Sequence, residues 1–308
     1  MYDIAPLPAR DGLPTVGLAL GSGAARGWSH LGVIDALAEL GIRPSVVCGC
    51  SIGALVGAAF VSGKAKALEE WVSALDWQGV LAMLDVSFKG GLIRGDRVVQ
   101  YCAQHFFAER FSDLATPFAC VATELSSGRE VWLRDGRIAD AVRASIALPG
   151  LFSPVERNGR VLVDGGLVNP VPVSLCRALG ADVVIAVELG SGVVGRAARR
   201  DARKGGEAGW TQRLLGAIGL PNGQAEGDAI AARTPSLPDV VTSSINIMQM
   251  RIARSRLAGE PADVLISPRV AQIGMMEFDR AAEAIAEGRA AVQRVHGLRQ
   301  SLGLEEHS

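Results

Sequence analysis

The chain has no strong excess of charge of either sign. Its 308 residues include 31 lysines and arginines and 32 aspartates and glutamates, which gives a formal net charge of −1. A protein that binds nucleic acid needs a basic face to neutralise phosphates, so we expect no nucleic-acid partner. Aromatic residues are also few, at 5%, whereas apolar residues reach 49% and charged residues 20%. This balance excludes a disordered chain and allows a large core.

Cysteine is scarce as well. The sequence has five cysteines, an odd number, and no CxxC pair. A disulfide framework or a zinc site of the usual spacing is therefore not expected. A reducing compartment fits this cysteine usage better than an oxidising one.

The sequence lacks a targeting or membrane-spanning segment of the usual kind. Residues 1–14 have no apolar core such as a signal peptide needs. Residues 44–63 form an uncharged run of 20 residues, which is long enough to cross a bilayer. Glycines interrupt this run and its first half is β-like, so we interpret it as a buried strand that turns into a buried helix. We expect a cytoplasmic protein, with peripheral contact to a membrane surface as an open alternative.

Short apolar runs alternate with helical patterns along the chain. The strand at 15–20, the helix at 25–40, the strand at 45–50 and the helix at 52–61 follow one another through short links. This alternation predicts parallel strands with right-handed crossovers. A hairpin turn at 124–128 makes the predicted sheet mixed. Further strands are expected at 118–123, 130–133, 160–163, 182–187 and 263–266, and further helices at 66–75, 96–107, 171–179, 240–257 and 277–296.

Residues 190–238 differ in composition from the rest of the chain. They are rich in glycine, alanine and arginine, and their strand and helix patterns are poor. We interpret them as an insertion or mobile cover within a single domain that spans 1–308, with its core at 16–190 and 239–296. Residues 196–204 carry five basic side chains and one acid. A solvated stretch is the favoured interpretation, and attraction to anionic lipid headgroups is the alternative, with an interfacial helix at 210–220.

A serine in the segment from Gly49 to Gly53 is the first candidate for chemistry. The segment matches the pattern G-x-S-x-G and lies between a predicted strand and a predicted helix, which is the context that a nucleophilic serine requires. A sharp turn there brings the residues two before and two after Ser51 together, so glycines relieve the clash. Ser51 is then held in strained geometry with its hydroxyl exposed. The alternative is that Ser51 merely caps the helix.

A serine nucleophile needs a base. The chain order of an α/β-hydrolase triad would leave His296 or His307, and neither follows a strand. His30 lies in the first predicted helix and is interpreted as a packed or surface histidine. Asp164 ends a predicted strand and is followed by two glycines, which let the backbone turn away so that the carboxylate can face a cleft. An ordinary Asp-Gly turn is the alternative at Asp164.

The glycine-rich loop at 21–27 follows the first strand and opens the first helix. Such a loop presents unpaired N–H groups to a negative oxygen. A dinucleotide-binding loop would have glycine where Arg26 stands, and an acid at the end of the second strand. Both features are missing, so an oxyanion hole beside Ser51 is favoured. Arg26 is either an exposed helix residue or an anchor for the loop or for an anionic group.

These three elements, in this order, resemble the patatin-like phospholipase family. The resemblance extends over Leu20–Val33 and Arg143–Leu151, and it is closest to the short bacterial RssA subgroup, which is related to the catalytic domain of neuropathy target esterase. It implies a three-layer α/β/α sandwich with a central, mostly parallel sheet. It also implies a Ser-Asp dyad without histidine, in which Ser51 is the nucleophile and Asp164 the general base.

The resemblance further implies that the substrate is a lipid acyl ester, such as a phospholipid or lysophospholipid, and that no metal or cofactor is needed. Ser22 and Ala24 stand where the family usually has glycine. A scaffold that binds a protein partner with little turnover, through 190–238 or the helix at 245–252, is the alternative function, and a homo-oligomer is left open. The implied oxyanion hole comprises Gly21, Ser22, Gly23 and Ala24, and the motif-supporting residues are Arg26, Gly27, Gly49, Gly53, Gly165 and Gly166.

Overall fold

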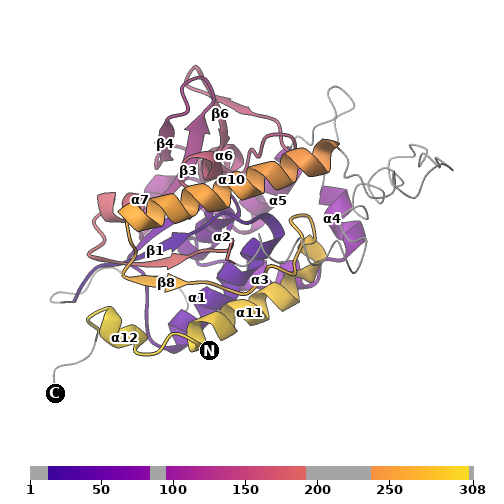
Figure 1. The fold of residues 1–308 in the computed structure, drawn as a ribbon. Helices are drawn as coiled ribbons and strands as arrows, with labels where there is room; N and C mark the ends of the chain where they lie inside the picture. Colours follow the sequence, from indigo (N-terminus) through magenta and orange to yellow (C-terminus); the bar gives the residue numbers. More distant parts are fainter. Residues whose placement is uncertain (1–12, 84–94, 192–236, 305–308) are drawn as a thin grey trace.

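A mixed sheet of eight strands organises the part of the chain that the structure, a computed structural model, describes: residues 13–83, 95–191 and 237–304 (Figure 1). The strands are β1 (Val16–Leu20), β2 (Val46–Cys50), β3 (Phe118–Glu124), β4 (Glu130–Leu133), β5 (Val155–Arg157), β6 (Arg160–Asp164), β7 (Val183–Val187) and β8 (Val264–Ile266). Hydrogen-bonded neighbours follow the order β5-β6-β3-β2-β1-β7-β8, and β4 also pairs with β3. The pairs from β3 to β8 in this order are parallel, and the pairs of β3 with β4, β3 with β6 and β5 with β6 are antiparallel.

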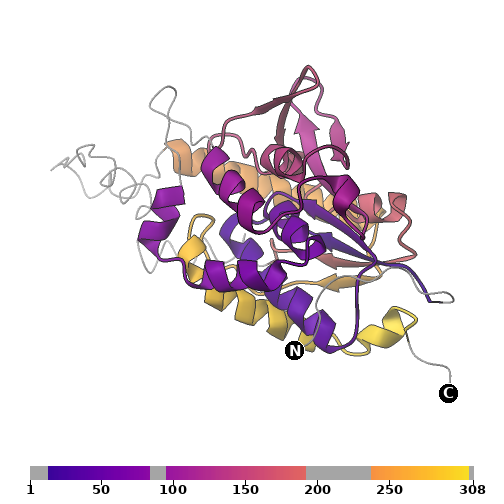
Figure 2. The same ribbon diagram turned by 180° about the vertical axis from the view of Figure 1, so that it is seen from behind.

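Helices cover both faces of this sheet, as the two opposite views show (Figures 1 and 2). The α-helices are α1 (Ser29–Glu39), α2 (Ile52–Val61), α3 (Ala65–Ser73), α4 (Trp77–Met83), α5 (Asp96–His105), α6 (Ile138–Ser145), α7 (Val173–Ala178), α10 (Leu237–Gly259), α11 (Ala281–Gln293) and α12 (Leu298–Ser301). Short 3-10 turns are η1 (Ala24–Trp28), η2 (Phe111–Asp113), η3 (Gly165–Leu167) and η5 (Phe278–Arg280).

Alternation along the central strand β1 separates two apolar cores. Leu18 and Leu20 belong to the core that α1, α2 and α11 complete, whereas Ala19 belongs to the core that α7 and α10 complete on the opposite face. All five residues of β1 are buried, as is usual for a parallel strand covered by helices on both faces. The predicted α/β fold, a mostly parallel sheet between two layers of helices, is therefore confirmed.

All the strands and helices that the pattern predicts within the described residues are present, with ends shifted by a few residues. The predicted helix at 25–40 begins as the 3-10 turn η1 before it becomes α1. The sequence analysis missed α4, α6, β5 and α12, and two of these are too short to show a period, since β5 has three residues and α12 four. The basic run at 196–204 and the segment at 210–220 lie outside the described residues, as does almost all of the predicted insertion at 190–238.

The register along β3 brings the ends of β2 and β6 together. Residues 118–121 of β3 pair with β2, residues 122–124 pair with β6, and residues 120–123 pair with β4. Because β4 overlaps both other strands, it occupies one edge of β3, and β2 and β6 follow one another along the other edge. β2 ends at Cys50 opposite Val121, and the antiparallel β6 ends at Asp164 opposite Ala122. The carboxyl ends of β2 and β6 therefore meet head to head.

Two glycines let α1 and α11 pack backbone against backbone. A Cβ at Gly32 would lie 1.9 Å from the Ile285 carbonyl oxygen, and a Cβ at Gly288 would lie 2.0 Å from the Ser29 carbonyl oxygen. These atoms belong to main chain on the facing helix, so they cannot rotate away as a flexible side chain could.

We predict that Gly288→Ala lowers the free energy of unfolding by about 1 to 3 kcal/mol, because the added methyl group forces the two helices apart. Urea denaturation followed by circular dichroism measures the change. Gly259→Ala is the matched control, since a Cβ at Gly259 would meet no atom within 4 Å. Equal stability of the Gly288→Ala variant and the wild type would contradict the close packing of α1 on α11.

Candidate active site

Ser51 lies in a strained turn between β2 and α2. Its backbone has φ 55° and ψ −123°, a region that residues other than glycine rarely adopt. A Cβ at Gly49 would lie 2.4 Å from the Gly53 carbonyl oxygen, and a Cβ at Gly53 would lie 2.1 Å from the Leu20 carbonyl oxygen. The turn thus has the close approach that the spacing of the motif predicts, and neither glycine has room for a side chain.

The side chain of Ser51 is not used to cap α2. It makes no capping hydrogen bond, and the residue is only half-buried, so the interpretation of Ser51 as a mere helix cap is wrong. The backbone N–H of Ser51 instead donates to the Ser145 hydroxyl at 2.9 Å, and that hydroxyl donates to the Val121 carbonyl at 2.7 Å. Ser145, at the end of α6, thereby joins the turn to β3. The sequence analysis quoted this serine within a matching segment but gave it no role.

Asp164, at the end of β6, presents its carboxylate to the same point. The side chain is 1% exposed, and its Oδ1 accepts a hydrogen bond from the Gly166 N–H at 2.7 Å. The Asp-Gly turn that the sequence offered as an alternative is therefore real, but it uses only one oxygen. Oδ2 is buried without a hydrogen-bond partner among the described residues. A buried, unpaired carboxylate oxygen is costly, which makes Asp164 a candidate for a chemical role.

Burial controls the protonation of Asp164. Removal from water raises the pKa of its carboxyl from 3.8 to about 6, and the Ser51 hydroxyl and the Gly166 amide lower this pKa in part. Because Oδ2 has no hydrogen bond of ordinary geometry, the Ser51 hydroxyl is near the carboxylate without being fully engaged by it. Catalytic hydrogen bonds are often long before the substrate binds. The carboxylate is still mainly ionised at neutral pH, so it is able to accept a proton.

The loop after β1 leaves only some of its N–H groups free. The N–H of Gly21 donates to the Val187 carbonyl at 3.0 Å, and the N–H of Ser22 donates to the Pro170 carbonyl at 2.8 Å. The expectation that all four residues from 21 to 24 supply oxyanion donors is thus wrong for these two, because long-range backbone acceptors already hold them. The N–H groups of Gly23 and Ala24 donate to no other described residue. They remain the candidate donors of this loop.

His30 holds the same loop from behind. It is fully buried in α1, and its Nε2 lies 2.8 Å from the Gly21 carbonyl oxygen. Burial lowers the pKa of the imidazole to about 4, so the ring is neutral at pH 7 and Nε2 donates this hydrogen bond. The interpretation of His30 as a packed core histidine is confirmed. His105 and His296 are exposed and, like His30, form no hydrogen bond with Ser51 or Asp164.

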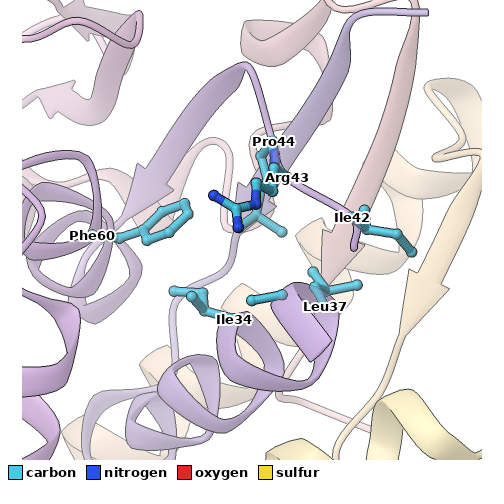
Figure 3. A pocket seen from close by; sticks show the side chains of 8 residues that line it. Ile34, Leu37, Ile42, Arg43, Pro44 and Phe60 are labelled. Atoms are coloured by element: carbon cyan, nitrogen blue, oxygen red, sulfur yellow. The ribbon is translucent and has the colours of Figure 1, made fainter. Parts of the chain in front are cut away.

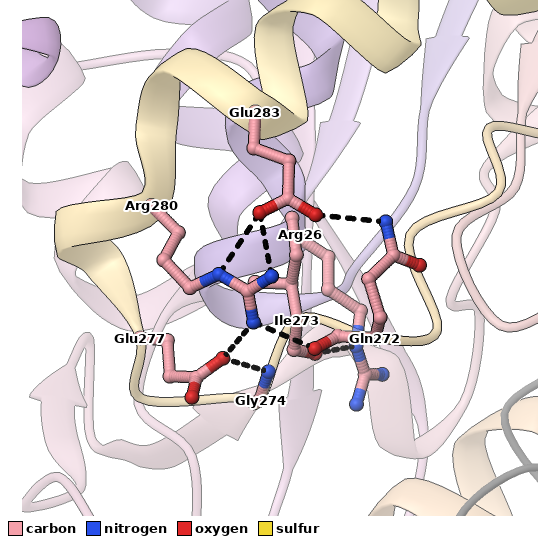
Figure 4. Close-up of polar contacts among 7 residues, drawn as sticks. All are labelled: Arg26, Gln272, Ile273, Gly274, Glu277, Arg280 and Glu283. Carbon is pink, nitrogen blue, oxygen red and sulfur yellow. Dashed lines mark hydrogen bonds and ion pairs between the residues drawn. The ribbon is translucent and has the colours of Figure 1, made fainter.

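Arg26 anchors the loop instead of facing solvent. Its side chain is 4% exposed, its Nε donates to the Ile273 carbonyl at 2.9 Å, and its guanidinium also reaches Asn246 Oδ1 at 3.4 Å. The segment it holds is itself braced by Arg280, which donates to the Gln272 carbonyl and forms ion pairs with two glutamates (Figure 4). The exposed-residue interpretation of Arg26 is therefore wrong, and the anchoring one is confirmed.

Gln249 on α10 lies between the two halves of the site, and the sequence gave no signal for it. Its side chain is 7% exposed, and its Oε1 accepts a hydrogen bond from the Ser22 hydroxyl at 3.4 Å. A Cβ at Gly166 would lie 2.5 Å from Gln249 Nε2, so the amide touches the turn that follows Asp164. Helix α10 consequently spans from the glycine-rich loop to the Asp164 turn.

Of two small hollows among the described residues, one lies near these elements and one does not. One is bounded by the glycine-rich loop, the end of β7 and α10, has a volume of about 20 Å³, and is lined by Ser22, Arg26, Glu188 and Gln249 among others. The other lies beside the start of β2, at the end of the sheet away from Ser51, and its lining includes Ile34, Ile42 and Phe60 (Figure 3). Each has room for about one water molecule. Within the described ranges, no group of three or more His, Cys, Asp or Glu side chains could hold a metal ion.

Fold and turn together define a class of structure: an α/β fold with a strained, half-buried serine at the carboxyl end of a central strand, next to the point where strand order reverses about β1. Sequence comparison agrees, since the profile of the family described as patatin-like phospholipase matches residues 18–177. The chain belongs to the patatin-like phospholipase family. Membership in this family supports a lipid hydrolase.

Individual relatives point to one branch of the family. An uncharacterized NTE family protein of Mycobacterium tuberculosis is 34% identical over 325 residues, covering 90% of each chain. The human patatin-like phospholipase domain-containing protein 6 is 32% identical over 186 residues, which cover 58% of this chain and 13% of that protein. The predicted relationship to the branch of neuropathy target esterase (NTE) is therefore confirmed.

A solved structure, VipD from Legionella pneumophila, aligns over 97% of this chain and 70% of its own with a TM-score of 0.45 and 14% identity. As for membrane spans, none of the helices in the described ranges combines the length and the apolar character that crossing a bilayer requires.

We predict that Asp164→Asn stabilises the fold at pH 8. The wild-type carboxyl ionises at about pH 6 in the folded protein and near 3.8 when unfolded, so wild-type stability falls as pH rises through this window. Asparagine has no such loss and can still accept from Gly166. The variant should exceed the wild type by up to about 3 kcal/mol at pH 8 and lose this advantage near pH 4.

Denaturation midpoints at the two pH values measure this difference. Asp279→Asn, which removes the same charge from an exposed position, is the control. A stability gain that does not change between pH 4 and pH 8 would show that the burial of the Asp164 charge is not its cause.

Proposed function

We propose that the chain hydrolyses carboxylic esters of lipids, phospholipids or lysophospholipids, through a Ser51–Asp164 dyad and an acyl-enzyme intermediate. One observation carries the proposal: a strained, half-buried serine and a buried carboxylate with an unpaired oxygen converge where β2 and β6 meet. Family membership supports the lipid class of the substrate. A Ser-Asp dyad needs no histidine, and none of the histidines in the described ranges forms a hydrogen bond with Ser51 or Asp164.

In the first half of the reaction, Asp164 accepts the proton of the Ser51 hydroxyl while the serine oxygen attacks the ester carbonyl. The carbonyl oxygen becomes negative, and the free N–H groups of Gly23 and Ala24 bind it. The start of α2 adds its positive end to the same region. Collapse of the tetrahedral intermediate breaks the ester bond, and the proton passes from Asp164 to the departing alcohol.

In the second half, water replaces the alcohol. Asp164 takes a proton from the water as it attacks the acyl-enzyme, and the proton returns to Ser51 when the carboxylic acid leaves. An aspartate is a weak base, but a pKa of about 6 makes Asp164 a stronger one than an ordinary carboxylate. Preorganised N–H donors supply a further share of the barrier reduction, about 3 to 4 kcal/mol for one donor in comparable sites.

We predict that a fluorophosphonate probe labels the wild type covalently and does not label Ser51→Ala. The probe reacts with an activated serine hydroxyl, and labelling is read by gel fluorescence and by mass spectrometry of the modified peptide. Ser145→Ala is the matched control, since it alters a neighbouring hydroxyl that lies 2.9 Å from the Ser51 nitrogen but keeps the proposed nucleophile. A probe adduct on Ser51→Ala would refute the assignment of the nucleophile.

We predict that Asp164→Asn loses p-nitrophenyl ester hydrolysis by about 100-fold or more, because the general base is gone. His296→Ala should keep the activity, since His296 is exposed and forms no hydrogen bond with the dyad. For the wild type, kcat/KM should fall about tenfold per pH unit below pH 6, as the Asp164 carboxylate becomes protonated. Loss of activity in His296→Ala with retention in Asp164→Asn would instead favour a histidine-based triad.

Turnover on lysophospholipid vesicles separates this proposal from its alternative. Release of fatty acid by the wild type, measured by mass spectrometry against a Ser51→Ala control, supports a lipid hydrolase. Release that does not exceed that control would favour a patatin-like scaffold whose task is to bind a protein partner.

A further inference from the structure

Helix α10 has two faces of different character. Its inner face, with Ile245, Gln249, Met250 and Ala253, is buried against the site and the neighbouring core. Ile245, Gln249 and Ala253 recur every four residues and Met250 is adjacent to Gln249, which places all four on one side of the helix. Figure 1 shows the helix running across the face of the molecule between α7 and α5. The helix thus packs against the rest of the protein through its inner face.

Its outer face exposes four large apolar side chains, and Ser244 on the same side is exposed as well. Val240 is 44% exposed, Val241 38%, Ile247 44% and Met248 49%. The spacing of seven residues between the two pairs corresponds to two helical turns, so all four lie on the same side. They account for four of the ten large apolar side chains that are exposed among the described residues. Such a cluster marks an interaction surface.

The outer face becomes basic where its apolar part ends. Arg251 and Arg254 are exposed, and helical spacing places both on the side of Val240 and Ile247. Helix α10 contains three arginines and one acid, Asp239, and Arg256 forms ion pairs with Glu130 and Glu260, so Arg251 and Arg254 are the exposed arginines of the helix. An apolar patch joined to cationic side chains fits the boundary between acyl chains and anionic headgroups, where apolar burial and electrostatic attraction add.

We propose that the outer face of α10 docks on a lipid bilayer that carries anionic headgroups. This inference rests on the proposed function, because it explains how a lipid ester reaches the site. The inner face contacts both halves of that site through Gln249, which touches Ser22 and the turn at Gly166. Docking through α10 therefore places the Ser51–Asp164 pair next to the membrane surface that holds the substrate.

Vesicle co-sedimentation of full-length protein in the Ser51→Ala background tests the proposal without interference from hydrolysis. Vesicles of phosphatidylcholine alone are compared with vesicles that also contain phosphatidylglycerol. We expect Ile247→Asp/Met248→Asp to lower the partition coefficient about tenfold or more on both vesicle types. Arg251→Gln/Arg254→Gln should lose only the preference for phosphatidylglycerol. Leu40→Asp/Leu265→Asp, with side chains 44% and 47% exposed elsewhere, is the matched control and should bind as the parent does.

Unfolding midpoints of every variant establish that each chain remains folded. Equal partitioning of all variants would overturn the proposal, as would no binding of the parent to either vesicle. Conversion of a dimer into a monomer by the α10 substitutions, without a change in partitioning, would assign this face to a second copy and would also overturn it. Failure of the proposed function appears separately, as absence of ester turnover by the wild type.

Discussion

The head-to-head meeting of β2 and β6 on one edge of β3 is the constraint on which the site depends. Each strand has its position set by backbone pairing, and a slip by one residue would turn its side chains to the opposite face. A Cβ at Gly165 would lie 2.3 Å from the Val121 carbonyl oxygen of β3, and a Cβ at Gly49 would meet the backbone of Gly53 and Ala54 at the start of α2, so neither strand end has room for a side chain at these positions. The relation of Ser51 to Asp164 is therefore set by the sheet, which holds a site more accurately than loops do.

This junction concentrates unfavourable features that the large core around it can tolerate. Ser51 has a positive φ, Asp164 is a buried carboxyl with a raised pKa, and Oδ2 lacks a hydrogen bond. A strained backbone residue alone costs of order 1 to 3 kcal/mol. If Ser51 and Asp164 act as the proposed dyad, these features share one location for a reason: a reactive hydroxyl must be free of hydrogen bonds that hold it unreactive, and burial makes the carboxylate a stronger base. Under the proposed function, the fold is less stable at Ser51 and Asp164 because these residues must react.

Local pattern was enough to predict the sheet, the turn at Ser51 and the strand that ends at Asp164, because each depends on apolar periodicity and on glycines a few residues away. It was not enough to predict which N–H groups of the glycine-rich loop are free. Gly21 and Ser22 are bonded to Val187 and Pro170, and nothing near the loop indicates those acceptors. The sequence did not indicate Gln249 for the same reason, because Ser22, its hydrogen-bond partner, lies in a distant segment of the chain.

Under the proposed function, the site must exclude water and must also receive a substrate from a bilayer. Helix α10 bears on both requirements. Its inner face places Gln249 against the turn that follows Asp164, and the raised pKa of that carboxyl depends on its burial. Exposure of its outer apolar face to water is unfavourable, and burial of that face in lipid would remove this cost. With docking as proposed, one helix covers the base on one side and meets the membrane on the other, so desolvation of the site and delivery of the ester share one structural element.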